Sequence, residues 1–383
     1  MDYLLTEEQQ MIKELCHQIA VEKISPIAAE YDEKNEFPWE IVKILADSDI
    51  FGVYIPEEYG GLGGGVFEMS LAAEELSWGC GGIALCFAAT GLGAFPLLLF
   101  GNHEQKSKYL PQIASGKKLA AFCITEAEAG SDVGNIKTTA VKDGDDYILN
   151  GTKQWITNGG EAEIYTIIAM TNKNKGARGA SAFIVEKDTP GLSFGKKEDK
   201  LGIRGSATRE VIMTDVRVPK ENLISKEGMG FIVAMKTFDN SRPGVAAQAL
   251  GISQRALDES VKYAHQRKQF GSAISSFQGI QFMLADMAIQ TEASRALIYA
   301  TAKMVDAGAK SVAKESAMSK TFASDTAMKV TTDAVQILGG YGYMREYPVE
   351  KLMRDAKITQ IYEGTNQIQR GVIASALIKE LNR

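Results

Sequence analysis

The first third of the chain has the spacing of apolar residues that amphipathic helices require. Between residues 6 and 116 apolar side chains recur three and four positions apart, as at Ile12, Leu15 and Ile19, and the pattern returns at residues 39–53. The segments 67–79 and 84–101 are apolar on nearly every side. We therefore expect a group of helices, interrupted by a glycine-rich turn at residues 56–65, in which these two segments are buried on most faces.

Near Leu119 the spacing of apolar residues changes from that of helices to the shorter spacing of β-strands. Runs rich in β-branched residues occupy positions 164–171, 179–186, 192–195 and 209–219, with Gly, Pro and Asn between them. Asp143–Gly144 and Asn150–Gly151 have the composition of tight turns. Because these runs follow one another through turns rather than through helices, we expect a compact β domain of mostly antiparallel strands that ends near Ile224.

The helical period returns after residue 231 and continues to Arg383. Residues 280–305 repeat it over about seven turns. One face of the segment 244–264 collects Val245, Ala249, Ile252, Ala256 and Tyr263. Helices of this length are typical of a four-helix bundle.

These zones predict an α+β fold of three domains packed as one body. We expect an all-α N-terminal domain at residues 1–120, a middle antiparallel β-sandwich or barrel domain at 121–232, and a C-terminal helical bundle at 233–383. At 383 residues the chain exceeds the size at which one hydrophobic core usually divides. The sequence contains no repeat and no flexible linker between the zones.

Composition narrows the classes of function. The chain has 42 Lys and Arg against 48 Asp and Glu, a net charge of −6, and no basic block, so nucleic acid is not an expected partner. No apolar run is long enough for a membrane span, and the first residues lack a signal-peptide pattern. Four cysteines without a CxxC pair and three scattered histidines predict no metal site. We expect a soluble cytoplasmic protein.

Common nucleotide-binding and nucleophile motifs are absent, and small-polar clusters stand in their place. The clusters are "TEAEAGSD" at 125–132, "WITNGG" at 155–160, "QRKQFG" at 266–271, "QILGGYGY" at 336–343 and "IYEGTNQ" at 361–367. Each one alone is also explained as a turn, a strand end or a helix cap. Glu363 alone, between two helical runs, is explained as an acid favoured by the dipole of the following helix.

Taken in order, these clusters resemble the acyl-CoA dehydrogenase family. The resemblance runs from "LTEEQQ" through "PEEYGGLG" and "DVRVPKENL" to "RDAKITQIYEGTNQIQR", which is essentially the full chain, and favours the short- and medium-chain, butyryl-CoA dehydrogenase-like branch. It implies a flavoprotein of fatty acid β-oxidation that converts acyl-CoA to trans-2-enoyl-CoA. It also implies FAD as the hydride acceptor, an electron-transferring flavoprotein as the next electron carrier, and a homotetramer built as a dimer of dimers.

The resemblance assigns Glu363 as the catalytic base. Removal of a weakly acidic α proton needs a carboxylate whose pKa is raised by a dry pocket. Gly364 lets the backbone pass close to the substrate, and Thr365 or Asn366 is expected to cap the last helix. No acid stands in residues 242–251, where the isovaleryl branch places its base.

The resemblance also assigns FAD and substrate contacts. Trp155 is expected against one face of the flavin, with Thr157 near its N5 atom. Arg267 and the FAD residues that follow it in the chain are expected to bind the ADP half of the FAD of the neighbouring subunit. The expected FAD residues are Phe122, Ile124, Thr125, Gly130, Ser131, Trp155, Ile156, Thr157, Arg267, Gln269, Phe270, Gln278, Gln336, Ile337, Gly339, Gly340, Thr365 and Gln367. The expected acyl-CoA residues are Ser131, Phe238, Asp239, Arg242, Tyr362 and Gly364.

Two features of the sequence bear on the details. Ala127 and Glu128 replace a turn proline and a glycine that are common in the family, which puts the rigidity of this turn in question. Residues 84–93, which shape the acyl pocket in the family, are small and apolar and predict an uncharged acyl group, short to medium in length. A branched or cyclic acyl-CoA, an oxidase on the same fold, and a non-catalytic acyl-CoA-binding assembly protein are the alternatives.

Overall fold

The N-terminal region is helical, as predicted. The computed structural model describes residues 3–381; residues 1–2 and 382–383, the outer ends of the two expected helical zones, lie outside this range. The helices are α1 (Glu7–Ile19), α2 (Ala28–Lys34), α3 (Trp39–Asp47), α4 (Val66–Gly79), α5 (Leu85–Phe100) and α6 (His103–Ala114). Most side chains of α4 and α5 are buried all round, which confirms the prediction for these two segments.

Helix α1 departs from the predicted apolar face in one position. Thr6 caps the helix, with Gln9 completing a capping box. Cys16 and Ile19 are buried, but Leu15 is 39 % exposed. The prediction for Leu15 was wrong because the helix turns Cys16, a small hydrophobic residue, toward the core instead.

The middle region is one eight-stranded sheet. Its strands are β1 (Ala120–Cys123), β2 (Thr139–Asp143), β3 (Asp146–Thr157), β4 (Ile164–Met170), β5 (Ala180–Glu186), β6 (Leu192–Phe194), β7 (Thr208–Pro219) and β8 (Leu223–Ile224). The order is β6-β7-β3-β2-β4-β5-β8, with β1 paired to β4. Only the pairs of β4 with β1 and with β2 are parallel, so the prediction of a mostly antiparallel sheet is confirmed.

One of the two predicted turns lies inside a strand. Asp143 and Gly144 begin the tight turn between β2 and β3 as expected. Asn150 and Gly151 instead form an irregularity within β3, where the register against β7 shifts. Gly151 has φ 145°, and a Cβ there would lie 2.6 Å from Thr138 Oγ1. An Asn-Gly pair serves a bulge as well as a turn, because both need glycine's conformational freedom and small size.

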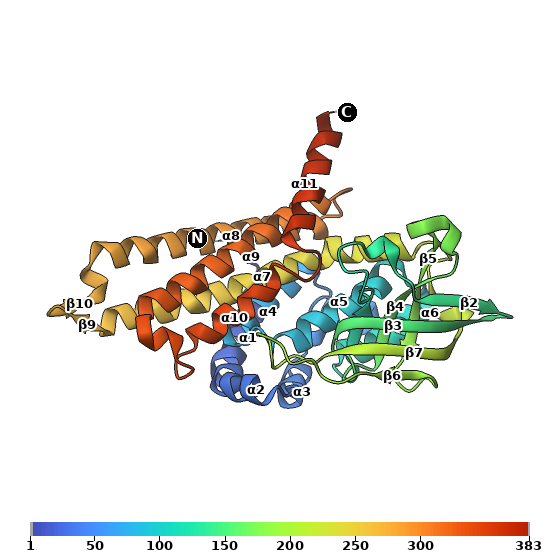
Figure 1. Cartoon of the computed structure of the whole chain (residues 1–383), viewed down its shortest axis with the longest axis horizontal. Coiled ribbons are helices and arrows are strands. Elements are labelled where there is room, and N and C mark those ends of the chain that lie inside the picture. The colour runs from blue at the N-terminus through green and yellow to red at the C-terminus, as the bar shows by residue number, and fades with distance from the viewer. Residues whose placement is uncertain (1–2, 382–383) are drawn as a thin grey trace.

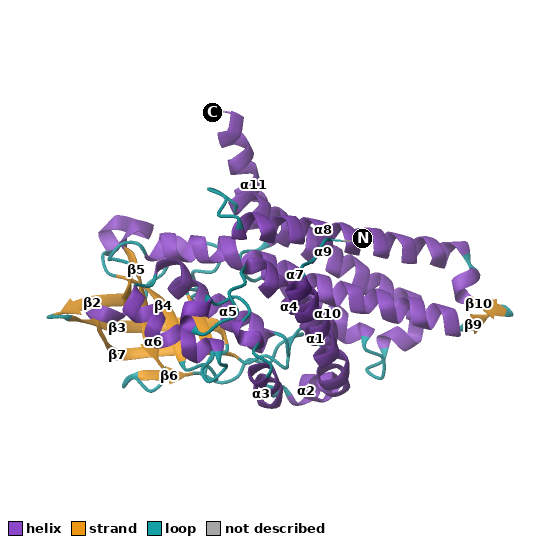
Figure 2. Ribbon diagram, turned by 180° about the vertical axis from the view of Figure 1, so that it is seen from behind, coloured by secondary structure: helices purple, strands orange, loops and turns teal. Residues whose placement is uncertain are grey.

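Long helices form the C-terminal region. They are α7 (Gly230–Gln266), α8 (Gln278–Asp306), α9 (Ala313–Leu338), α10 (Val349–Thr359) and α11 (Asn366–Leu381), with a small hairpin of β9 (Lys268–Gln269) and β10 (Ser272–Ala273) after α7. Figure 1 shows the sheet at one end of the molecule, α7, α8 and α9 running away from it, and the β9–β10 hairpin at the far tip. Figure 2 shows the same arrangement from behind, with α11 projecting from the body.

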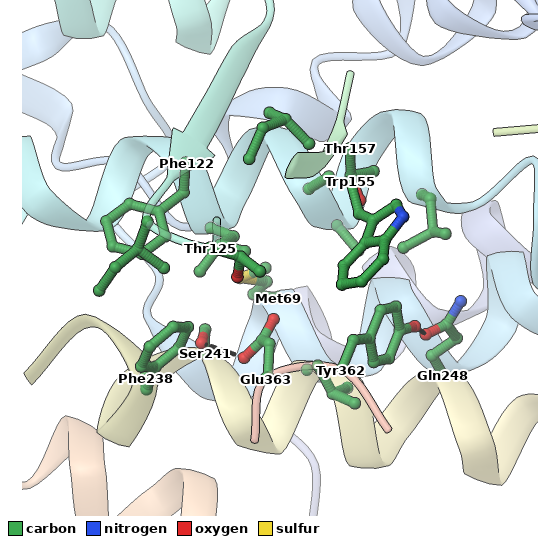
Figure 3. Close-up of a pocket in the computed structure, with 18 residues that line it drawn as sticks. Met69, Phe122, Thr125, Trp155, Thr157, Phe238, Ser241, Gln248, Tyr362 and Glu363 are labelled. Carbon is green, nitrogen blue, oxygen red and sulfur yellow. Dashed lines mark hydrogen bonds between the residues drawn. The ribbon is translucent and has the colours of Figure 1, made fainter. Parts of the chain in front are cut away.

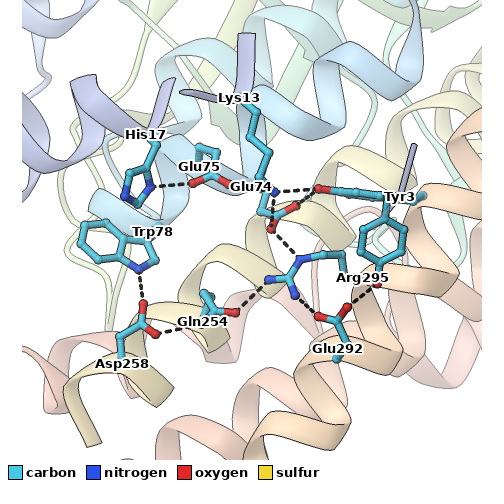
Figure 4. Close-up of polar contacts among 11 residues, drawn as sticks. Tyr3, Lys13, His17, Glu74, Glu75, Trp78, Gln254, Asp258, Glu292 and Arg295 are labelled. Atoms are coloured by element: carbon cyan, nitrogen blue, oxygen red, sulfur yellow. Dashed lines mark hydrogen bonds and ion pairs between the residues drawn. The ribbon is translucent and has the colours of Figure 1, made fainter. Parts of the chain in front are cut away.

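A polar network joins the N-terminal helices to the C-terminal ones (Figure 4). Glu74 on α4 is only 3 % exposed, and it accepts hydrogen bonds from Arg295 Nε at 2.9 Å and from Tyr299 Oη at 2.7 Å, both on α8. Lys13 on α1 contacts Glu74 at 3.5 Å and Glu75 at 3.1 Å. These contacts fix α1 and α4 against the bundle.

Within residues 3–381, no helix is both long and apolar enough to cross a membrane, and no cluster of His, Cys, Asp and Glu side chains is arranged to hold a metal ion. The four cysteines are buried and form no disulfide.

Candidate active site

A cavity of about 120 Å³ lies where the helices meet one end of the sheet. Side chains from α4, α5 and α7 form its apolar floor, and the ends of β1 and β3 form the opposite wall. Figure 3 shows Glu363 reaching into this cavity from the segment between α10 and α11, with Trp155 on the far side. Glu363 is the only charged side chain among the described residues that line it.

The backbone at Glu363 is in the left-handed region. Its φ is 52°, and Gly364 follows with φ 90°. A non-glycine residue at positive φ is strained, and such residues persist only where surrounding contacts hold them. The next residue, Thr365, accepts a hydrogen bond through Oγ1 from the Ile368 amide at 3.3 Å, so it is Thr365 that caps α11. The break between the two helices therefore aims the carboxylate into the cavity.

The Glu363 carboxylate is held by α7. Ser241 Oγ donates a hydrogen bond to its Oε2 at 2.5 Å. Burial raises the pKa of Glu363, and this hydrogen bond, Arg242 and Lys320 oppose the rise. A carboxyl with a raised pKa in an apolar cavity is suited to accept a proton from carbon.

The first predicted flavin segment divides into two parts. Phe122, Ile124 and Thr125, at the end of β1 and just beyond it, line the cavity. Phe122 also packs edge-on against Phe238 of α7, with ring centroids 5.5 Å apart. Gly130 and Ser131 are exposed and do not line it.

Trp155 is turned toward the cavity by a bulge. The pairing of β3 with β7 shifts register between Lys153 and Ile156, and Trp155 between them has φ 55°. The indole is 56 % exposed and lines the cavity together with Ile156 and Thr157. A large aromatic ring held open in a strained conformation is typical of a ligand-binding surface.

Apart from Ser131, the predicted substrate residues lie around the base. Phe238 and Tyr362 line the cavity. Asp239 and Arg242 form a buried ion pair at 3.4 Å, and Arg242 Nε donates to the Glu363 carbonyl at 3.4 Å. These two residues lie within α7, and their ion pair is buried rather than on the surface.

The domains of one enzyme family match the chain in order. The acyl-CoA dehydrogenase N-terminal domain matches residues 6–117, the middle domain residues 121–216, and the C-terminal domain residues 228–378. The chain belongs to the acyl-CoA dehydrogenase family.

Relatives of known name agree with this assignment. The short-chain-specific acyl-CoA dehydrogenase of Clostridium acetobutylicum is 47 % identical, covering 99 % of this chain and all of the relative. The acryloyl-CoA reductase (NADH) of Anaerotignum propionicum is 49 % identical, covering 99 % of this chain and 96 % of the relative.

Solved structures give the same result. Butyryl-CoA dehydrogenase from Megasphaera elsdenii is 48 % identical with a TM-score of 0.96, covering 99 % of this chain and 100 % of that one. A chain in a structure described as the electron-transferring flavoprotein of Acidaminococcus fermentans is 51 % identical with a TM-score of 0.96, covering 98 % and 99 %. An acyl-CoA dehydrogenase of Bacillus anthracis complexed with FAD is 37 % identical with a TM-score of 0.93, covering 99 % and 68 %.

A second group of predicted FAD residues lies at the far end of this acyl-CoA dehydrogenase. Arg267, Gln269, Ile337, Gly339 and Gly340 line a hollow next to the β9–β10 hairpin. At a rise of about 1.5 Å per residue, α7 separates Ser241 from Arg267 by about 39 Å. That distance is longer than one dinucleotide.

The remaining predicted FAD residues lie around these two places. Phe270 is 96 % exposed and has φ 51°. Gln278 begins α8, and Gln336 lies in the last turns of α9 next to the hollow's glycines. Thr365 and the exposed Gln367 lie at the start of α11, beside the base.

The turn at residues 125–132, which lacks the proline common in the family at Ala127, is held by a buried ion pair between Glu126 and Lys153. Glu126 accepts hydrogen bonds from the Lys137 and Thr138 amides at 2.6 and 3.0 Å. Lys153 Nζ, fully buried, donates to Glu126 at 2.8 Å and to the Ile124 carbonyl at 3.0 Å. These bonds give the turn the rigidity that a proline at Ala127 would otherwise supply.

Several residues of the site, among them Ser241, Met69 and Gln248, were not among the predicted site residues. Ser241 binds the base, Met69 lines the floor, and Gln248 accepts a hydrogen bond from the Tyr362 hydroxyl. Met69 lies on a helix that is apolar all round, where nothing distinguishes a pocket residue from a core residue. Ser241 stands between Asp239 and Arg242, which were both predicted as acyl-CoA residues, but only the fold brings its hydroxyl to Glu363.

Proposed function

We propose that this chain is an FAD-dependent acyl-CoA dehydrogenase that introduces a trans-2 double bond into a short- to medium-chain, uncharged acyl-CoA. The observation that carries the proposal is the Glu363 carboxylate, which has a raised pKa and faces an apolar cavity opposite Trp155 and Thr157. The reaction needs a base on one side of the substrate and a hydride acceptor on the other.

Glu363 takes the proton from the carbon next to the thioester. Ser241 holds one carboxylate oxygen, which leaves the other directed at the substrate. The apolar walls exclude water, so the proton goes to the carboxylate rather than to solvent. The Glu363 amide, at positive φ, is the group we assign to the thioester oxygen, where negative charge develops.

FAD fits the residues present. Trp155 presents an exposed aromatic face to the cavity. In the hollow near Arg267, a Cβ on Gly339 or Gly340 would meet no atom within 4 Å, so a ligand has room beside the Arg267 guanidinium. FAD bound against Trp155 and Thr157 supplies the acceptor for the hydride of the β carbon. Because the two groups of FAD residues are far apart in one chain, we assign the second group to the cofactor of a neighbouring subunit.

This arrangement supports a homotetramer of the family's type, a dimer of dimers. The solved structure described as an electron-transferring flavoprotein, to which the chain is similar, supports such a flavoprotein as redox partner. We also propose the three-domain division at residues 1–120, 121–232 and 233–383 and a cytoplasmic location.

The lining of the cavity supports an uncharged acyl group. Ala88 and Ala89 make its α5 wall small and apolar, and apart from Glu363 none of the described residues that line it carries a charge. An acyl chain with a second carboxylate would leave that charge unpaired.

The proposal is tested by anaerobic titration of the purified holoenzyme with acyl-CoAs of graded length and branching. Bleaching of the flavin is expected with short straight-chain substrates. Stronger bleaching by a branched or cyclic acyl-CoA would move the substrate assignment to that class, and rapid peroxide formation in air would identify an oxidase. A protein that binds acyl-CoA without bleaching, or that is colourless, would overturn the proposal.

Met69 is expected to limit the length of the acyl chain. Its Cε lies 2.4 Å from where a Cβ on Gly91 would stand and 3.5 Å from the corresponding position on Gly244, so the side chain fills a notch between α5 and α7. Met69→Ala should raise the ratio of kcat/KM for longer over shorter acyl-CoAs by about 10-fold, since each methylene accommodated contributes about 1–3 kcal/mol. The ratio is measured over the same graded series.

Met69→Leu is the matched control, because it nearly conserves volume and should keep the original chain-length preference. Thermal unfolding of both variants shows whether they are folded, since the Ala variant also loses about 2–5 kcal/mol of stability through the cavity. An Ala variant that is folded and has an unchanged preference would place the length limit elsewhere.

A further inference from the structure

A buried lysine lies under the turn that carries the base. Lys320, on α9, is fully buried and is among the largest side chains with almost no exposed surface. Its Nζ donates to the Gly364 carbonyl and to Asn366 Oδ1, both at 2.9 Å. No carboxylate forms a hydrogen bond with it in the described part of the chain, so the buried amino group is directed at the turn itself.

The same turn is held from two other elements. Gln369 Nε2, on α11, donates to the Glu363 and Gly364 carbonyls at 3.0 Å each. Arg242 Nε, on α7, reaches the Glu363 carbonyl at 3.4 Å. The two residues at positive φ are therefore fixed by side chains from three helices, and Lys320 is the one that ties the turn to the first residue of α11.

We propose that Lys320 is a positioning residue for the reaction: through Gly364 and Asn366 it fixes the turn that aims Glu363, and its charge favours the ionised base. The inference rests on the proposed function of Glu363. It goes beyond that function because Lys320 touches neither the cavity nor the substrate.

The charged groups around Lys320 determine its protonation state and, through it, its effect on the pKa of Glu363. The groups that act on its pKa are Glu363 on the turn, Arg242 on α7 and Asp325 on α9; Arg242 is paired with Asp239, and Asp325 with Arg370 on α11. Burial lowers the pKa of Lys320 to about 7, and Glu363 opposes this change. Below that pH the ammonium form prevails, and its charge lowers the pKa of Glu363 against the effect of burial.

The test is Lys320→Met in the holoenzyme. The Gly364 carbonyl keeps Gln369 as a donor, and the Asn366 amide nitrogen keeps its hydrogen bonds to Ser324 and Asp325, so the variant is expected to fold. We expect kcat to fall by about 10- to 100-fold with KM little changed, because a base displaced by about 1 Å loses rate at that scale. In the pH profile of kcat, the acidic limb should move to higher pH, because the neutral Met side chain no longer lowers the pKa of Glu363.

A second readout does not depend on activity. Hydrogen–deuterium exchange of residues 359–369 should be faster in Lys320→Met than in the natural protein, since the turn has lost one of its restraints. Two controls use the same substitution: Lys329 is exposed on the same helix, and Lys351 is buried on α10, bonded to Asp355 and Cys80. Neither variant should shift the acidic limb or speed exchange at the turn.

The outcomes separate the two proposals. If the natural protein and the Lys329 variant bleach with acyl-CoA while the Lys320 variant keeps its kcat, acidic limb and exchange rate, the role of Lys320 is overturned and the proposed function stands. The role is also overturned if Lys351→Met gives the same shift, because the effect is then general destabilisation. If the natural protein does not bleach, the proposed function fails, and faster exchange alone still shows that Lys320 holds the turn. Lys320→Gln replaces the Met variant if that protein does not assemble.

Discussion

Glu363→Gln is expected to lower turnover of acyl-CoA by at least about 10²-fold, because a positioned general base contributes about 10²–10⁴ to the rate. The amide keeps the size and the hydrogen bond with Ser241 but has no basic oxygen. The variant should remain yellow, since the cofactor residues are unchanged. Turnover is measured with a dye as electron acceptor, and the flavin spectrum is recorded on the same sample.

The same substitution has an opposite expected effect on stability. Burial raises the pKa of Glu363, so the folded chain binds that proton more tightly than the unfolded chain does. Its contribution to stability is therefore complete below the ordinary pKa of 4.5 and is lost as the pH rises through the raised value. At neutral pH the Gln variant should unfold at the same temperature as the natural protein or at a higher one. Turnover close to the natural rate in a folded variant would remove Glu363 from its role.

Arg295→Met is expected to lower the free energy of unfolding by about 3 kcal/mol, since it removes the nearer cation from the buried Glu74 carboxylate, which keeps the longer ion pair with Lys13 at 3.5 Å. Arg295 on α8 binds Glu74 at 2.9 Å and Gln254 on α7 at 2.8 Å, so the change affects both the join to α4 and the packing of two bundle helices. The loss is measured from urea unfolding followed by tryptophan fluorescence; Trp78, bonded to Asp258 at 2.7 Å, lies in the same network.

Arg217→Met is the matched control for this prediction. Arg217 also pairs with two carboxylates, Asp143 and Asp146, but it lies on the surface of the sheet, where ion pairs contribute little. Its loss should leave the unfolding midpoint almost unchanged. Equal effects of the two substitutions would show that the Glu74 network does not join the helical regions more strongly than a surface pair.

Local patterns predicted the elements well because each depends on nearby residues. The alternation of β-branched runs and the all-round apolar character of α4 and α5 are properties of short windows, and the structure reproduces them. The Asn150–Gly151 turn was predicted wrongly for the same reason, since the bulge in β3 depends on Thr138 and β7, which no short window includes.

The sequence by itself determined the succession of helices, strands and helices and the family, and its motifs named Glu363 as the candidate base, because periodicity, turn chemistry and motifs are written in adjacent residues. Only the tertiary structure decided what surrounds that acid. Ser241, Met69 and Lys320 come from three different helices and carry no local signal, since a serine, methionine or lysine in a helix looks the same whether it faces a core, a cavity or a turn. Their meaning arises from packing, which sets distances between residues that are remote along the chain.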